Sequence, residues 1–268
     1  MFHRLRQLLK LFVPPVLVDL VRGRLNLPPG YTWEGIYPHR RDVPVRHASY
    51  DHEARISEMA AQGRDLLGQV RAGQRPGLWH DTLALVAATV SAGSGRLRVV
   101  DFGGAMGTGF IQLIATLPPT TALEYHVVDL PGMCAAGREV FASEPRIRFH
   151  TTLAEVPAEP DIVYVNSVLQ YIDDYASQLR ALAALRAPRL LLARTAIGDF
   201  PTFATRQLNL PGQVLAYWFL NQDEVLGVLA GAGYRLAFES LGDREYDQTN
   251  FPVTHRIGRM RNLLFVHG

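Results

Sequence analysis

Short apolar runs alternate with helical patterns from residue 97 to the end of the chain, and this alternation restricts the fold more than any other feature of the sequence. A strand that is followed by a helix and another strand forms a parallel pair, with the helix packed on the sheet. The last two runs have no helical pattern between them, which favours an antiparallel hairpin at the sheet edge. The predicted strands are Leu97–Phe102, Glu124–Leu130, Ile147–Thr151, Asp161–Ser167, Arg189–Arg194, Tyr234–Ser240 and Asn262–His267.

Helical periodicity fills most of the intervals between these runs. Two further helices are predicted before the first strand, at 51–72 and 78–92. The expected fold is therefore α/β: a Rossmann-like, mostly parallel seven-stranded sheet with helices on both faces and an antiparallel terminal hairpin, plus N-terminal helices. The predicted helices within the sheet region are Thr108–Thr116, Pro131–Phe141, Tyr175–Leu185 and Asp223–Gly231.

The first 24 residues carry apolar side chains at three- and four-residue steps, flanked by Arg and Lys. This pattern predicts two short amphipathic helices with a kink at Pro14 and Pro15. They could lie in the plane of an anionic membrane surface, or they could pack on the domain or on a second subunit. The apolar run is too short to cross a bilayer, and no signal-peptide cleavage site follows it.

The segment Asn26–Val45 is rich in Pro, Gly and aromatic residues, which indicates an ordered loop or linker. We therefore divide the chain into 1–45, the N-terminal helices and linker, and 46–268, the main domain. The sequence leaves the oligomeric state open.

Composition narrows the class of protein. The net charge is +2, so nothing indicates a nucleic-acid partner. Cys134 is the only cysteine, which excludes an internal disulfide and a cysteine-based zinc site, and we predict no metal. A reducing compartment fits this cysteine usage, so we expect a cytoplasmic protein, with peripheral contact to the inner membrane face if residues 1–24 form the anchor.

A glycine-rich loop follows the first predicted strand directly, with the sequence Asp101-Phe-Gly103-Gly104-Ala105-Met-Gly107-Thr-Gly109. Ligands of open α/β sheets bind at the carboxyl ends of the strands, and glycines let a ligand approach the backbone closely. A dinucleotide fingerprint read from Gly103 would require glycine at positions 105 and 108, which hold Ala105 and Thr108. The loop therefore argues against a nicotinamide-dependent oxidoreductase.

Polar residues also end the second and fourth predicted strands. Asp129 and Leu130 close the second, where a carboxylate can accept both hydrogen bonds of a ribose diol. The alternative for Asp129 is an acidic residue that is favoured by the dipole of the next helix. Asn166 and Ser167 end the fourth strand, within the segment Asp161–Asp174.

These three motifs together resemble those of the class I S-adenosylmethionine-dependent methyltransferases. The resemblance implies that the loop wraps the methionine part of the cofactor, that Asp101 helps to hold its amino group, and that Asp129 binds its ribose. Ala105 stands where the family has its middle glycine. The implied cofactor-binding residues are Asp101, Gly103, Gly104, Ala105, Gly107, Asp129, Leu130, Asn166 and Ser167.

A narrower resemblance covers most of the chain. It is to a bacterial family assigned as methyltransferases, whose members tend to be linked to surface polysaccharide gene neighbourhoods. The resemblance does not extend to a substrate. We expect a small-molecule or glycan acceptor, and a lipid-linked glycan would suit an enzyme held on a membrane. The residues that carry it are Trp33, Gly35, Tyr37, Asp101–Gly104, Leu169–Tyr171, Arg194–Thr195 and Thr205–Gln207.

Residues for the chemistry itself are harder to predict. Arg194 could clamp an anionic group of the acceptor or form a salt bridge, and Tyr171 could line the acceptor pocket or pack in the core. We expect His80 to cap a helix or lie at the surface, and His126 to be structural. No catalytic base is identified, which keeps a catalytically inactive binding or scaffold protein as an alternative.

Overall fold

The computed structural model describes residues 31–46, 52–77, 80–209 and 213–268. The helices expected within residues 1–24 lie outside this part of the chain. Among the described residues, no helix is both long and apolar enough to span a bilayer.

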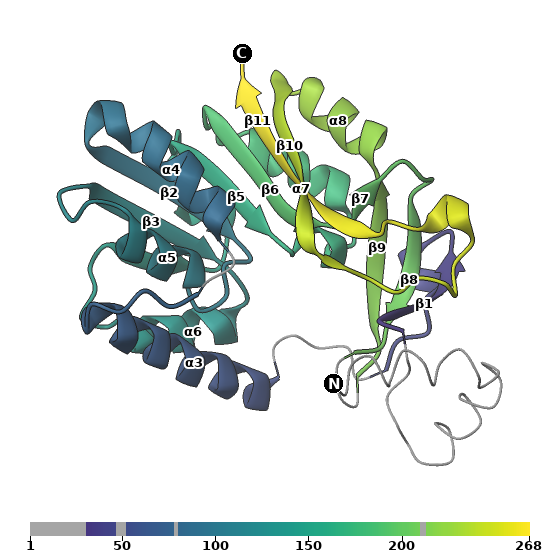
Figure 1. Ribbon diagram of the computed structural model, residues 1–268, viewed down its shortest axis with the longest axis horizontal. Helices are drawn as coiled ribbons and strands as arrows, with labels where there is room; N and C mark the ends of the chain where they lie inside the picture. Colours follow the sequence, from purple (N-terminus) through teal and green to yellow (C-terminus); the bar gives the residue numbers. More distant parts are fainter. Residues whose placement is uncertain (1–30, 47–51, 78–79, 210–212) are drawn as a thin grey trace, which may run out of the picture.

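A seven-stranded sheet forms the centre of the molecule (Figure 1), with the strand order β10-β11-β6-β5-β2-β3-β4. The five strands from β6 to β4 run parallel, whereas β11 is antiparallel to both β6 and β10. The predicted fold class is confirmed, including the antiparallel hairpin. The strands are β2 (Arg96–Phe102), β3 (Ala122–Val128), β4 (Ile147–His150), β5 (Ile162–Asn166), β6 (Arg189–Thr195), β10 (Tyr234–Glu245) and β11 (Arg259–His267).

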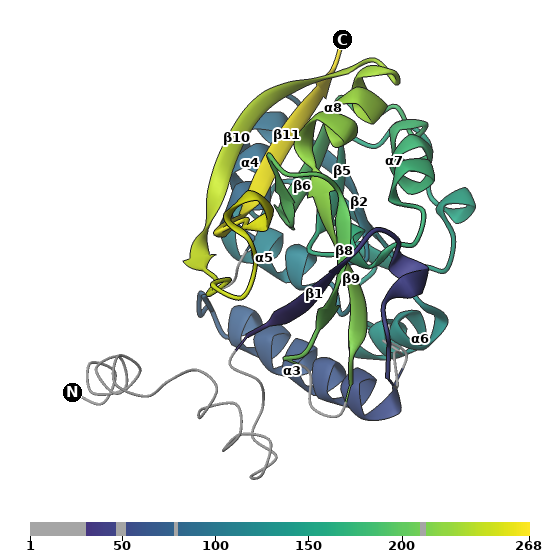
Figure 2. The ribbon, with the colours of Figure 1, turned by 90° about the vertical axis from the view of Figure 1, so that its right-hand side faces the viewer.

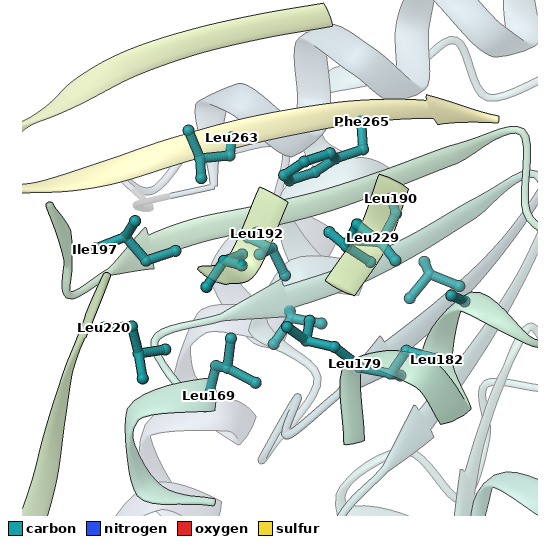
Figure 3. Packing of buried hydrophobic residues seen from close by; sticks show 14 of the residues in the cluster. Leu169, Leu179, Leu182, Leu190, Leu192, Ile197, Leu220, Leu229, Leu263 and Phe265 are labelled. Carbon is teal, nitrogen blue, oxygen red and sulfur yellow. The ribbon is translucent and has the colours of Figure 1, made fainter. Parts of the chain in front are cut away.

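Helices cover both faces of this sheet because successive strand residues point to opposite sides. On β6, Leu190 and Leu192 pack with α7 and α8, and Leu191 and Ala193 pack with α4 and α5. Figure 3 shows the first of these two cores, in which Leu190 and Leu192 lie among leucines of α7, α8 and β11. The helices are α3 (Glu53–Arg71), α4 (Asp81–Ser94), α5 (Thr108–Thr116), α6 (Pro131–Val140), α7 (Tyr175–Ala183) and α8 (Gln222–Ala230).

A second sheet of four strands, in the order β1-β8-β9-β7, was not predicted from the sequence. Its strands are β1 (Trp33–Tyr37), β7 (Ile197–Gly198), β8 (Phe203–Gln207) and β9 (Leu215–Asn221). The interpretation of Asn26–Val45 as a loop or linker was therefore wrong for β1, which pairs with β8. Trp33 at the start of β1 packs against Tyr217 and Phe219 of β9, so an aromatic core holds this segment. The domain division at residue 45 stays a prediction.

The small sheet stands at the carboxyl ends of β5 and β6 (Figures 1 and 2). It reaches this position because β7 follows β6 almost directly in the chain. Strand β9 also packs on η3 (Leu169–Tyr171), the single helical turn that follows β5. The small sheet therefore covers the carboxyl ends of β5 and β6.

Candidate functional site

A cavity of about 570 Å³ opens at the carboxyl ends of β2, β3 and β5. Small-molecule sites in proteins usually have volumes of roughly 300–1,000 Å³. The cavity brings together residues that the sequence placed on three separate motifs. The predicted residues that line it are Gly103, Ala105, Asp129, Leu130, Asn166, Ser167 and Tyr171.

Asp101 does not line the cavity. It is buried beneath the glycine loop, where Oδ2 accepts a hydrogen bond of 2.7 Å from the Tyr125 hydroxyl. The pKa of the Asp101 carboxyl is raised to about 7, mainly by burial and to a smaller extent by the charge of Asp129, against the lowering effect of the Tyr125 hydrogen bond. The role of holding an amino group, implied by the resemblance, stays a prediction. In this structure the carboxyl group supports the loop from below.

Gly104 and Gly107 support the loop and do not line the cavity. A Cβ on Gly104 would overlap the Asp101 carboxylate. Gly107 has φ = +64°, and a Cβ there would meet the side chain of Ile147. Close packing beneath the loop therefore requires glycine at both positions.

Ala105 adopts the left-handed conformation, with φ = +47°. Its backbone N–H donates to Oδ2 of Asp129 at 2.8 Å, which joins the loop to the end of β3. The other carboxylate oxygen accepts from the N–H of Leu130 at 2.7 Å. Alanine thus takes a conformation that favours glycine, so the departure from the family pattern at this position leaves the turn intact.

The end of β5 supplies the opposite wall. Ser167 has φ = +56°; its N–H donates to the carbonyl of Ala193, and its hydroxyl accepts from Gln170. The buried Oδ1 of Asn166 accepts no hydrogen bond from the described residues. An unpaired buried oxygen costs stability, so it marks a place where a ligand donor would be favourable. The left-handed conformation of Ser167 is a second sign of a ligand site, because non-glycine residues in sparsely populated conformations concentrate at functional sites.

Other lining residues were missed by sequence reasoning. Arg55 and Met59 belong to α3, and Thr151 follows β4. The pattern at 51–72 predicts the helix, but nothing in the sequence indicates that its first turns reach this cavity. Packing of α3 against α5 and α6 places them there.

Arg194 does not line the cavity. It lies at a register shift of β6 with φ = +49°, and its N–H donates to Oδ1 of Asn262 at 2.9 Å. Such irregularities redirect side chains. The Arg194 charge acts on His80 and Tyr164, on the α4 side of the sheet, so the acceptor clamp expected of Arg194 stays a prediction.

His80 is buried, so the expected surface location was wrong. It occupies the N-cap position of α4, but its side chain caps no N–H. Instead Nδ1 lies 2.8 Å from the Tyr164 hydroxyl and Nε2 lies 3.0 Å from the Thr108 hydroxyl. Burial, aided by the Arg194 charge, lowers the pKa of His80 to about 4. Both ring nitrogens are hydrogen-bonded to hydroxyl groups, and His80 does not line the cavity.

His126 has the structural environment expected of it. It is buried on β3, with Nε2 at 3.0 Å from Glu124 and Nδ1 at 2.9 Å from Nε2 of His150. No cluster of three His, Cys, Asp or Glu within the described ranges could hold a metal ion.

No family model and no curated protein matches the sequence. Solved structures are similar in fold. Magnesium protoporphyrin IX methyltransferase from Synechocystis, solved with S-adenosylhomocysteine, shares 20% identity over 81% of this chain and 100% of its own, with a TM-score of 0.46. An amino pentose methyltransferase from Micromonospora echinaspora, solved with S-adenosylmethionine, shares 18% identity over 83% and 100% of the two chains, with a TM-score of 0.48.

A third similar structure is 1,6-didemethyltoxoflavin-N1-methyltransferase from Burkholderia thailandensis. It shares 19% identity over 82% of this chain and 92% of its own, with a TM-score of 0.42. These similarities concern the fold alone.

Proposed function

We propose that this protein is an S-adenosylmethionine-dependent methyltransferase. One observation carries the proposal: the Asp129 carboxylate, the left-handed turn at Ala105 and the unpaired Asn166 oxygen, from three separate motifs, meet around one cavity of small-molecule size. The strand order places this cavity at the carboxyl edge, where open α/β sheets bind their ligands.

The residues present fit the cofactor. The Asp129 carboxylate can accept from both hydroxyls of a ribose, and its present contacts are with backbone N–H groups of the loop and of Leu130. The exposed backbone at Gly103 and Ala105 lets the chain approach the methionine part closely. The Asn166 oxygen can accept from the cofactor's amino group.

The cofactor supplies a methyl group that moves to a nucleophilic atom of the acceptor while the carbon–sulfur bond breaks, its electron pair stays on sulfur, and the acceptor proton leaves to solvent. This chain contributes positioning and desolvation. Phe102, Val128 and Val168 give the cavity apolar walls, and Tyr171 lies at its edge with the small sheet. Holding two reactants in line can account for much of the barrier reduction in such displacements. The proposal therefore requires no general base.

Calorimetry on the purified full chain tests the proposal. We expect S-adenosylhomocysteine to bind and NAD not to bind. Asp129→Ala should weaken binding by roughly 1–3 kcal/mol, as expected when a charged hydrogen-bond partner is lost. Asp223→Ala, which removes an exposed carboxylate on α8, is the control. Binding of NAD alone, or equal affinities in wild type and Asp129→Ala, would refute the assignment.

The acceptor that we propose is a small molecule or a glycan. A lipid-linked glycan is proposed for the case that residues 1–24 hold the protein on a membrane. Co-sedimentation of the full chain with anionic liposomes, compared with a chain that starts at Asn26, separates the anchor from packing on the domain. An assay for transfer of a labelled methyl group from S-adenosylmethionine to an acceptor distinguishes an enzyme from a catalytically inactive scaffold that only binds the cofactor.

A further inference from the structure

A second cavity, of about 770 Å³, lies beside the first on the side of the small sheet. One wall is η1 (Arg40–Asp42), the helical turn after β1, and another is β9. Tyr171 lines both cavities, so a molecule in the second would lie against the same side chain as a ligand in the first. The two cavities are therefore adjoining sites with one residue in common.

Arg40 fixes the position of the η1 wall. Its guanidinium pairs with the Asp173 carboxylate and donates to the carbonyls of Ala216 and, at 3.4 Å, Gln170. These contacts tie η1 to β9 and to η3, the turn that carries Tyr171. Because Asp173 balances its charge, Arg40 acts as a positioning residue for the turn.

Arg41 is the next residue and also lines the cavity. It is exposed, and within the described chain its side chain makes no hydrogen bond or ion pair. The charged lining residues Arg40, Arg41 and Asp173 leave a formal charge of +1 on the cavity wall, carried by Arg41. A planar guanidinium binds phosphate and carboxylate groups through paired hydrogen bonds, which makes Arg41 a suitable anion ligand.

The rest of the lining is mostly apolar. Val43 and Leu215 are buried side chains of this wall, and Trp218 contributes its ring while its indole N–H donates to the Ile172 carbonyl at 3.1 Å. An apolar floor with one cation at the rim is complementary to a molecule that has a ring at one end and an anionic group at the other.

We propose that this second cavity is the acceptor site, and that the acceptor is a ring-bearing small molecule with a phosphate or carboxylate held by Arg41. The inference rests on the proposed methyltransferase function, since it assigns the acceptor's side of that reaction. It also gives the small sheet a role, because β9 and the turn η1 that follows β1 form walls of this cavity.

The test uses phenyl phosphate, benzoate and phenol as probes of the full chain saturated with S-adenosylhomocysteine. Chemical shifts of the Trp218 indole N–H report occupancy, because Trp218 is a lining residue and its N–H shift responds to ligands that contact the ring; Trp218→Phe assigns the signal. One or both anions should bind more tightly than phenol, and which of them does so distinguishes phosphate from carboxylate. Arg41→Ala should weaken the preferred anion by about fivefold or more, the loss expected for one charge-assisted pair.

Arg235→Ala, an exposed arginine on β10, is the matched control and should leave all three affinities unchanged. Equal binding of phenol and the anions, or equal anion affinity in wild type and Arg41→Ala, would overturn the proposal. The probes can be titrated without cofactor as well, so failure of S-adenosylhomocysteine to bind would count against the methyltransferase alone. Cofactor affinity should be the same in Arg41→Ala as in wild type.

Discussion

The buried carboxyl group beneath the glycine loop should contribute to the pH dependence of stability, and Asp101→Asn tests this. Burial raises the pKa of Asp101 from 3.8 to about 7. The folded state therefore holds a proton that the unfolded chain releases, and stability falls as pH rises through this interval. His80 acts in the opposite direction, because its pKa falls from 6.5 to about 4 and only the unfolded chain takes up the proton there.

The two contributions nearly cancel in the wild type. Between about pH 4.5 and about pH 6.5, loss of the Asp101 contribution lowers the free energy of unfolding by about 2–3 kcal/mol, since one bound proton corresponds to about 1.4 kcal/mol per pH unit. His80 raises it by about 2 kcal/mol over the same interval. Asp101→Asn removes the first contribution but keeps an acceptor for the Tyr125 hydroxyl, so the rise from His80 becomes visible.

Urea unfolding followed by circular dichroism at several pH values measures this effect. The difference in free energy of unfolding between Asp101→Asn and wild type should increase by about 2–3 kcal/mol across that interval. Other titrating groups contribute equally to both proteins and drop out of the difference. Asp223→Asn, at an exposed site on α8, is the control for loss of one carboxylate. A constant difference between Asp101→Asn and wild type at every pH would refute the burial argument.

Three further predictions concern the loop, the core and the histidine pair. Gly104→Ala should lower the free energy of unfolding by about 1–3 kcal/mol, because its Cβ overlaps the carboxylate below, and should weaken S-adenosylhomocysteine binding. Leu192→Ala should cost about 2–5 kcal/mol in urea unfolding, whereas Leu85→Ala, at a site that is 68% exposed, should cost little. Glu124→Gln should lower the pKa of His126 further in an NMR titration, because the Glu124 carboxylate now opposes the effect of burial; an unchanged pKa would contradict that hydrogen bond's role.

The large sheet and the first cavity could be predicted because their signals are local. Runs such as Leu97–Phe102 carry apolar residues on both faces, as is typical of buried parallel strands, and the helical periods between the runs predict the crossovers. Once the strands are parallel, their carboxyl ends share one edge. That topology alone brings Gly103, Asp129 and Asn166 to the same cavity.

By itself, the sequence thus determined that parallel strands alternate with helices, and which residues meet at the carboxyl ends of those strands. Tertiary structure decided what each carboxylate does and which segments form the walls of the cavities. Asp101 lies near the end of β2 and Asp129 directly follows the neighbouring β3, yet the first is hydrogen-bonded to Tyr125 beneath the loop and the second borders the cavity. The small sheet pairs Trp33 with Gln207, and strand pairing between such distant segments has no local signature, since strand preference depends on the partner and on burial. That pairing and the contacts of Arg40 bring Arg41 and Tyr171 to the lining of the second cavity, although the two residues are 130 positions apart in the sequence.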